Sequence, residues 1–178
     1  MASKKPDTIH YRRKRSGKTD YRKRLKLLLS GKSRLVVRTT NQKIIAQIIQ
    51  FTEKGDRVLA AVDSFGLKKL GWAYSCRNIP AAYLTGLLIG NQAKQKNLSD
   101  VVLDTGLLAP LKKGRLFAFL KGVVDGGLQL PVGSSDIFPS DNRLKGQHIA
   151  EYLKSSNHPE KMPSVFEDVQ RKIKGKGK

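Results

Sequence analysis

Residues Arg34 to Ile49 read RLVVRTTNQKIIAQII, and this stretch decides the fold class because it holds two strand-like runs joined by a polar turn. Leu35 to Thr39 alternates as a half-buried strand does, and Ile44 to Thr52 forms the second run. The alternation places Arg38 on the face opposite Leu35 and Val37. The stretch therefore predicts an antiparallel pair of strands with an arginine on one face and an amide-rich turn at one end.

The segments downstream predict how the sheet continues. A third strand-like run, Arg57–Asp63, follows a hairpin turn at Gly55. Apolar spacing then predicts a helix over Ala81–Ala93, a strand over Val101–Asp104, a helix over Gly114–Gly127 and a fifth strand in LQLP at 128–131. A helix between two strands implies a right-handed crossover, so the fourth strand is expected to lie parallel to the first. The order βββαβαβ predicts an α/β fold with a mixed sheet packed against helices.

Three helices have expected faces or caps. Asp20 is expected to cap a helix that runs to Leu29. Ser164 is expected to cap a terminal helix with the sequence SVFEDVQRKI. The apolar residues expected to dock the first helix are Leu25, Leu28 and Leu29, and those expected to face inward from the helix at 114–127 are Leu116, Phe117, Leu120 and Val124.

The composition points to a polyanionic partner. The 178 residues include 35 Lys/Arg against 14 Asp/Glu, a formal net charge of +21, and 39% hydrophobic residues are enough for one core. Nucleic acid is the first candidate partner and an anionic membrane surface is the second. Cys76 is the only cysteine, and neither a signal peptide nor a membrane-length apolar run is visible, so the expected location is the cytoplasm.

The positive charge is concentrated at the two ends of the chain. Residues 1–38 carry 14 Lys/Arg and two Asp, residues 171–178 carry five Lys/Arg and no acid, and the remainder is nearly balanced. This distribution predicts a basic RNA-binding arm at 1–19, a globular domain at 20–132 and a C-terminal extension at 133–178 with short helices and a basic tail. For the tail sequence KGKGK, a solvated face and phosphate contact are equally plausible interpretations. Residues 1–18 lack apolar periodicity and are expected to be extended or mobile until RNA orders them.

The N-terminal basic cluster is expected to contact phosphate, because such dense positive charge is costly unless phosphates neutralise it. Tyr11 and Tyr21 lie within the cluster and either stack on unpaired bases or anchor the arm to the globular domain. The candidate RNA-binding residues of this segment are Arg12, Arg13, Lys14, Arg15, Lys18, Tyr21, Arg22, Arg24 and Lys26.

Three fragments resemble parts of enzyme active sites, and each fails. SGKS at 30–33 lacks the glycine that a phosphate-binding loop needs five residues before Gly31, and it runs from helix to strand. Asp104–Gly106 matches the aspartic protease triplet, but Leu107 follows where those enzymes have Ser or Thr. A two-metal nuclease of βββαβ order needs a carboxylate on the first strand, which has none. The histidines show no metal-ligand spacing, so the sequence predicts no enzyme, no metal and no cofactor.

Four segments in order carry a family resemblance: TDYRKRLKLLLSGKSRLVVRTTNQKIIAQII at 19–49, IPAAYLTGLLIG at 79–90, VVLDTGLLAPLKKGRLFAFLKGVVDGGLQLP at 101–131 and RLKGQHIAEY at 143–152. Together they resemble the eighteenth-protein family of the large ribosomal subunit, in its archaeal form. The resemblance implies a ribonuclease-H-like fold without nuclease activity. It also implies binding of 5S ribosomal RNA and attachment of that RNA to the large ribosomal RNA at the central protuberance. The expected partners are therefore these two RNAs and neighbouring large-subunit proteins, on cytoplasmic ribosomes and with no membrane.

The resemblance also implies which further residues meet RNA. In the family, the sheet face and turn equivalent to RLVVRTTNQK at 34–43 lie on 5S RNA, and the loop before the second long helix contacts the same RNA. That loop departs here from the bacterial pattern, which is rich in aromatic residues and histidine. A-form RNA offers phosphates, 2′-hydroxyls and shallow base edges, which suit basic, amide and hydroxyl side chains. The candidates in these two segments are Arg34, Arg38, Thr40, Asn41, Gln42, Lys43, Lys112, Lys113 and Arg115. Lys32, Arg143 and His148 are further RNA-binding candidates.

Alternatives remain open at this level. The alternatives to a ribosomal protein are a generic cationic nucleic-acid-binding protein and a nuclease of ribonuclease-H-like fold. Arg38 has its own structural alternative, a solvent-facing arginine on a one-sided sheet. If Arg38 points out of the sheet towards RNA, Arg38→Glu is expected to weaken RNA binding and leave the fold intact.

Overall fold

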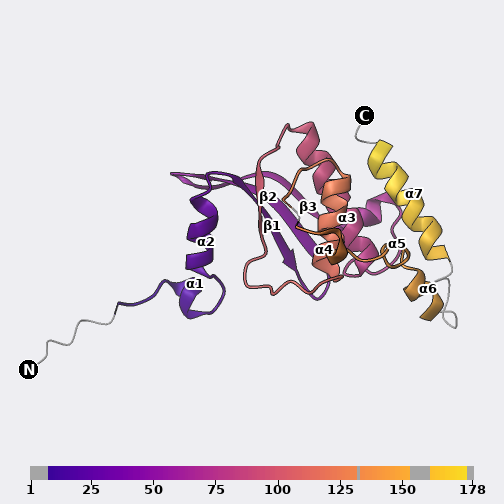
Figure 1. Ribbon diagram of the computed structural model, residues 1–178, viewed down its shortest axis with the longest axis horizontal. Coiled ribbons are helices and arrows are strands. Elements are labelled where there is room, and N and C mark those ends of the chain that lie inside the picture. Colours follow the sequence, from indigo (N-terminus) through magenta and orange to yellow (C-terminus); the bar gives the residue numbers. More distant parts are fainter. Residues whose placement is uncertain (1–7, 132, 153–160, 176–178) are drawn as a thin grey trace, which may run out of the picture.

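The computed structural model describes residues 8–131, 133–152 and 161–175, and Figure 1 shows a mixed α/β domain with helices on both sides of one sheet. The strands are β1 (Ser33–Thr39), β2 (Ile44–Thr52), β3 (Gly55–Asp63) and β4 (Val101–Asp104). The α-helices are α1 (Arg12–Arg15), α2 (Tyr21–Leu28), α3 (Ile79–Gln95), α4 (Arg115–Asp125), α5 (Asp141–Leu144), α6 (Gln147–Tyr152) and α7 (Met162–Gly175), with 3₁₀ helices η1 (Ser64–Leu70) and η2 (Ser135–Ile137). Within the described ranges, no helix has the length and apolar character that a membrane crossing requires.

The sheet confirms the predicted meander and crossover. Its strands lie in the order β3-β2-β1-β4. β2 is antiparallel to both neighbours, and β4 is parallel to β1 with Leu35 opposite Leu103. Leu35 and Val37 are buried on the face that α3 and α4 cover, whereas Arg34, Val36 and Arg38 lie on the face towards α2 (Figure 1).

The expected fifth strand at 128–131 is wrong, because the described part of the chain has only four strands. The segment instead closes the end of α4. Gly127 has a φ of 96°, which a left-handed helix cap requires, and the N–H groups of Gly127 and Leu128 donate to the carbonyls of Val124 and Val123. Leu128 is buried as the apolar contact of this cap, so its alternation with Leu130 reflects a helix end rather than a strand.

The core lies between the sheet and the pair α3 and α4, which touch at glycines. A Cβ added at Gly86 would fall on the carbonyl oxygen of Phe119, and one added at Gly122 would fall on that of Tyr83. The backbones of the two helices are therefore in direct contact. Within α4, Val124 is 38% exposed and Phe117 is only half-buried, whereas Phe119 and Val123 are buried. The expected inward face of this helix was thus correct at Leu116 and Leu120 and wrong at Val124.

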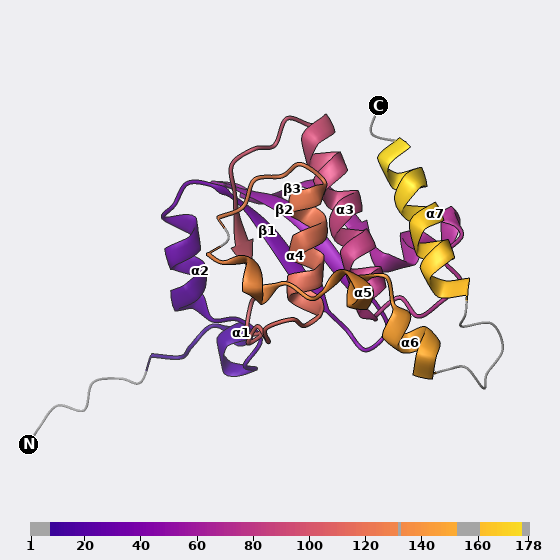
Figure 2. The same cartoon turned by 45° about the vertical axis from the view of Figure 1, so that its right-hand side comes forward.

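The C-terminal helix α7 packs on α3 at the side of the molecule remote from α2, as Figures 1 and 2 both show. Phe166 lies against Tyr83 with ring centroids 5.6 Å apart, and Asn91 donates to the carbonyl of Ile173 at 3.0 Å. α7 starts at Met162, so Ser164 is inside the helix and is not its cap; its hydroxyl donates to the carbonyl of Lys161. The tail residues 176–178 lie outside the described residues.

Candidate nucleic-acid interface

Helix α2 lies over the outer face of β1 without burying any of its own residues. Asp20 caps it as predicted, accepting from the backbone N–H groups of Arg22 and Lys23. The expected apolar docking is wrong at Leu25 and Leu29, which are 59% and 78% exposed, whereas Leu28 is half-buried. Polar contacts hold the helix instead: Lys23 Nζ donates to the Thr105 hydroxyl at 3.0 Å and to the Gly106 carbonyl at 2.9 Å.

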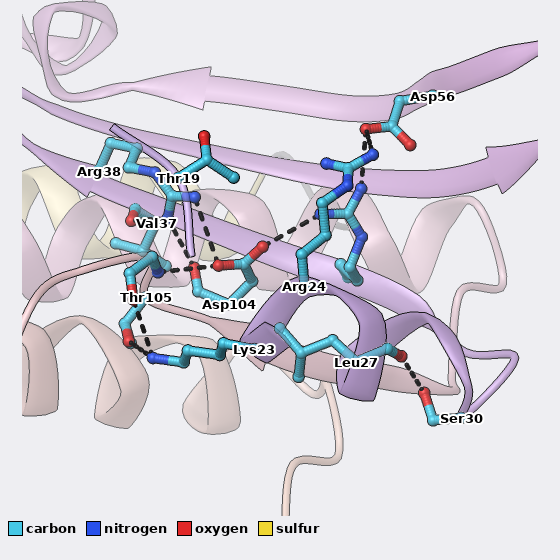
Figure 3. Close-up of polar contacts among 12 residues, drawn as sticks. Thr19, Lys23, Arg24, Leu27, Ser30, Val37, Arg38, Asp56, Asp104 and Thr105 are labelled. Atoms are coloured by element: carbon cyan, nitrogen blue, oxygen red, sulfur yellow. Dashed lines mark hydrogen bonds and ion pairs between the residues drawn. The ribbon is translucent and has the colours of Figure 1, made fainter. Parts of the chain in front are cut away.

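Beneath α2 lies a cluster of arginines and aspartates from three strands and the helix (Figure 3). Arg34 of β1 donates to Asp104 of β4 at 3.1 Å and to Asp56 of β3 at 2.8 Å. Arg24 of α2 donates to the same Asp56 oxygen at 2.9 Å. The side chain of Arg34 is 3% exposed. The structure shows Arg34 as a buried bridge between two carboxylates, and its role as an RNA contact stays a prediction.

Both aspartates of this cluster are held in the charged form. Burial alone would raise the pKa of Asp104, but the N–H of Gly106 and the guanidinium groups of Arg38 and Arg34 outweigh it, so that pKa lies below its usual range. The pKa of Asp56 is lowered in the same way, with burial opposed by hydrogen bonds from Arg24 and Arg34. The outer face of β1 thus carries a fixed network of charges.

Arg38 is on the outer face, as its place in the strand predicted, but its guanidinium is bound rather than free. It donates to the carbonyls of Val37 and Asp104 at 2.8 and 2.9 Å and forms an ion pair with the Asp104 carboxylate at 3.3 Å. The side chain remains 46% exposed. Arg38 therefore ties β1 to the end of β4 and still presents part of its guanidinium at the surface.

The polar turn after β1 is ordered by its own side chains. The Thr40 hydroxyl donates to the carbonyl of Lys43 and accepts from the N–H groups of Gln42 and Lys43. Lys43 forms an ion pair with Asp63 at 2.7 Å. Asn41 and Gln42 are exposed at the tip of the turn. The turn is a rigid, outward-facing element.

The turn and the loop before α4 belong to one edge of the sheet. Because β1 and β4 are parallel, the turn at 40–43 and the loop at 105–114 both leave from the carboxyl ends of these strands. Arg77 joins the two: it donates to the carbonyl of Asn41 at 3.0 Å and accepts from Arg115 at 3.4 Å through its own carbonyl. We call the surface formed by residues 38–43, Arg77 and residues 105–115 the cationic edge.

The two lysines of the loop differ in their surroundings. Lys112 is exposed, and no ion pair is formed by it among the described residues. Lys113 has a φ of 57° and pairs with Asp136 at 3.2 Å, with both side chains more than half exposed. An exposed pair of this kind is weak, so both lysines are available to an anion.

Within the basic arm, Arg12–Arg15 form the helical turn α1, which corrects the expectation of an extended arm for these residues. Residues 1–7 of the arm lie outside the described residues. In α1 the carbonyl of Tyr11 accepts from the N–H groups of Lys14 and Arg15. The rings of Tyr11 and Tyr21 are 5.2 Å apart, a contact that links the arm to α2. Stacking of either ring on a base stays a prediction. The basic side chains of the arm and α2 that lie exposed at the surface are Arg12, Arg13, Lys14, Arg15, Lys18, Arg22 and Lys26.

Three candidates lie apart from the cationic edge. Lys32 precedes β1, at the opposite end of that strand, and pairs with Asp100 at 3.1 Å. Arg143 and His148 are exposed on α5 and α6, on the side of the C-terminal extension (Figure 2). Burial and then the charge of Arg143 lower the pKa of His148 below its usual value, so this histidine is neutral near pH 7. Among the described residues, no hydrogen bond or ion pair joins any of the three to the turn at 40–43.

Sequence reasoning missed two residues of this region. Phe65 of η1 is 38% exposed and lies between the ammonium groups of Lys43 and Lys68, whose nitrogens are 5.1 and 5.0 Å from its ring centroid. Arg77, which links the turn to Arg115, was also missed. An isolated arginine before a helix gives no local signal of its role. The sequence did offer a signal for Phe65, an aromatic residue three positions before the lysine pair 68–69.

Among the described residues, the fragments that resemble parts of active sites have other roles or lack a needed group. The Asp104 carboxylate is occupied by two arginines and a backbone N–H. β1 carries no carboxylate, and Gly31 lies between α2 and β1, the reverse of a phosphate-binding loop. No group of three or more metal-ligating side chains exists in the part of the chain that the structure describes.

Comparisons with known proteins place the chain in a family. The family model described as "Ribosomal large subunit proteins 60S L5, and 50S L18" matches residues 7–101. A relative, "Large ribosomal subunit protein uL18" of Sulfurisphaera tokodaii, is 42% identical over 189 residues of alignment that cover 95% of each chain. The match extends well past the sheet into the C-terminal extension. The chain therefore belongs to the family of large-subunit ribosomal proteins that includes 60S L5 and 50S L18.

Proposed function

We propose that the chain binds 5S ribosomal RNA through the cationic edge and the N-terminal arm, and attaches it to the large ribosomal RNA at the central protuberance. The observation that carries this proposal is the contact from Asn41 through Arg77 to Arg115, which joins two separately predicted RNA-binding segments into one surface. A single rigid surface suits a single structured RNA better than scattered basic residues do.

Family membership supports a structural role. A large-subunit ribosomal protein is a structural constituent of that subunit, bound to the ribosome in the cytoplasm and not an enzyme, with ribosomal RNA and ribosomal proteins as partners. The 5S RNA, the central protuberance and the identity of each protein neighbour are the finer parts of our proposal. The C-terminal extension, on the side remote from the arm, is the region we assign to protein neighbours or the second RNA (Figure 2).

The chemistry of the cationic edge fits A-form RNA. Lys112 and the exposed part of Arg38 are donors to phosphate, and the amide side chains of Asn41 and Gln42 suit 2′-hydroxyls and the shallow minor groove. Phe65 offers an apolar ring for an unpaired base. Because the turn holds its own backbone in place, little conformational entropy is lost when RNA binds it.

A filter-binding titration with 5S RNA and a structured control RNA of equal length tests the proposal. We expect preference for 5S RNA at matched salt and, if about eight phosphates are contacted, a slope of log K against log salt of roughly −7. Equal affinity for both RNAs supports a generic cationic binder instead. A slope near −2 means that most basic residues face solvent or protein.

A matched pair of variants locates the surface. Lys112→Glu reverses an exposed charge on the cationic edge and is expected to weaken 5S binding about tenfold at low salt. Lys54→Glu makes the same change in the turn between β2 and β3, at the opposite end of the sheet, and is expected to change binding by less than about twofold. Equal losses in the two variants, with unchanged melting temperatures, contradict the assignment of the edge.

A further inference from the structure

A cavity of about 480 Å³ lies between the N-terminal arm, α2 and the outer face of the sheet. Val36 and Ile49 form its apolar wall. The charged side chains that line it are Arg13, Lys18, Asp20, Lys23, Arg24, Arg34, Arg38, Asp56 and Asp104. Six cationic groups thus face three carboxylates, and the cavity carries an excess of positive charge.

The carboxylates of the cavity are already occupied. Asp20 caps α2, Asp56 accepts from two arginines, and Asp104 accepts from two arginines and the N–H of Gly106. Several of the cations, in contrast, keep N–H donors without an acceptor in the part of the chain that the structure describes. Each guanidinium has five N–H donors, and the structure gives Arg24 one acceptor, through Nη2. Among the described residues Lys18 has no hydrogen-bond or ion-pair partner for its ammonium group.

Arg34 supplies a second, independent observation. Its Nε–H is the buried side-chain donor that lacks any acceptor in the described part of the chain, on a residue only 2% exposed. A buried donor without an acceptor is unfavourable, because it has lost water and gained nothing in return. Arg34 lines the cavity, which offers an incoming acceptor a path to this donor.

The cover of the cavity is able to move. α2 buries none of its residues, and its ties to the body are Lys23 on Thr105 and Gly106 and the Arg24 ion pair to Asp56, in which both side chains are about one third exposed. A multivalent anion competes for these same cations. An anion that takes over these cations is therefore expected to loosen α2 over Arg34.

We propose that this cavity is a binding site for a phosphoryl group, held by Lys18 and Arg24 from the cover and by Arg34 and Arg38 from β1. The phosphoryl group belongs either to an RNA backbone or to free phosphate. Only the first source rests on the RNA-binding function proposed above. Phosphate oxygens match the planar fork of a guanidinium, and two arginines converging from β1 favour this class of anion over a monovalent one.

The side-chain Nε–H signals of arginine in two-dimensional ¹H–¹⁵N NMR spectra of the full chain test the proposal. Sodium phosphate is titrated against sodium chloride at matched ionic strength. We expect the signals of Arg34 and Arg24, each assigned through the bonds of its own side chain, to shift saturably with phosphate and not with chloride. Lys18→Gln is expected to raise the dissociation constant about two- to fivefold. Lys94→Gln, which removes an exposed cation of α3 on the opposite face of the sheet, is the matched control and is expected to leave the dissociation constant unchanged.

Shifts that grow linearly and equally with both salts overturn the site, as does an equal effect of the two variants. A uridine trinucleotide then separates the sources: an RNA phosphate requires it to saturate the same signals, whereas a free-phosphate site responds to orthophosphate alone. The outcome is distinguishable from failure of the RNA-binding function. If the chain shows no preference for 5S RNA but the arginine signals still shift with phosphate, the RNA-binding function is refuted and the cavity site stands. If the chain prefers 5S RNA but the arginine signals do not shift, only the cavity site is refuted.

Discussion

On one face of the sheet, α3 and α4 meet so closely that a single Cβ at Gly86 or Gly122 would overlap the backbone of the other helix. On the other face, α2 lies over β1 with no buried residue and is held by lysine and arginine side chains. The first contact is apolar and excludes water. The second is polar and borders a cavity of about 480 Å³.

The two faces of the sheet are expected to differ in how they respond to salt and to phosphate. Apolar burial depends weakly on ionic strength, so the α3 and α4 side is expected to stay folded in any salt. Ion pairs that are partly exposed weaken with salt and exchange with phosphate, so the α2 side is expected to respond to both. The face that is least well packed is therefore the one suited to meet a polyanion.

The largest expected effect comes from closing the glycine contact. Gly122→Val places side-chain atoms on the Tyr83 carbonyl, which is backbone and cannot turn away, so we expect a loss of at least about 4 kcal/mol or failure to fold. Chemical denaturation at low and high salt measures it, and the loss is expected to be the same at both. Gly133→Ala, at a position with open space around its Cα, is the control and is expected to be nearly neutral. A stable Gly122→Val protein contradicts the close packing described here.

The next effect probes the charged face at its deepest point. Asp104→Asn leaves the buried guanidinium of Arg34 short of one partner, and breaking a buried pair from one side costs about 3 kcal/mol. Because the pKa of Asp104 is lowered on folding, its contribution is complete above its unfolded value of 3.8 and is lost as pH falls below that towards the folded pKa. We expect the acid-induced loss of stability below about pH 4 to be smaller in Asp104→Asn than in the parent chain. If the stability of the two proteins falls identically with pH, the lowered pKa of Asp104 does not contribute to the stability of the fold.

An intermediate effect is expected at Arg38. Arg38→Glu removes hydrogen bonds to two carbonyls and sets a carboxylate beside Asp104, so we expect a loss of about 2 kcal/mol in addition to weaker RNA binding. This revises the expectation that the fold would be untouched. The melting temperature reports the loss of stability. The affinity for 5S RNA, measured well below that temperature, reports the loss of binding separately. Arg38→Gln keeps a neutral hydrogen-bond donor, so it is expected to lose less stability and less affinity for 5S RNA than Arg38→Glu.

The smallest effect on stability is expected at the cover. Arg24→Ala removes a partly exposed ion pair and is expected to cost less than about 1 kcal/mol. Amide hydrogen exchange is the sharper measurement: exchange in α2 is expected to speed up, both in this variant and in the parent chain at high salt, while α3 is unchanged. Leu29→Ala, which shortens an exposed side chain at the C-terminal cap of α2, is the control. Equal protection of α2 and α3 in every condition removes the distinction between the two faces.

Local pattern was enough for much of the fold. The alternation in Leu35–Thr39 and Ile44–Thr52 predicted two neighbouring strands and the face on which Arg38 lies, and the crossover rule predicted the parallel pairing of β4. These features depend on residues close in sequence and on the handedness of the chain. The same pattern failed at Leu128, because a single buried residue after a helix cap imitates the alternation of a short strand.

What covers each face of the sheet was decided only by the tertiary structure. Alternation marks Arg34 and Arg38 as lying on the same side of β1, but their partners Asp56 and Asp104 are 22 and 66 or more positions away and carry no signal of pairing. The four-residue spacing of Gly86 with Gly90 and of Gly122 with Gly126 is visible in the chain, yet its meaning depends on the two helices meeting. Charge and hydropathy state what a side chain needs, and only the folded backbone determines which distant group supplies it.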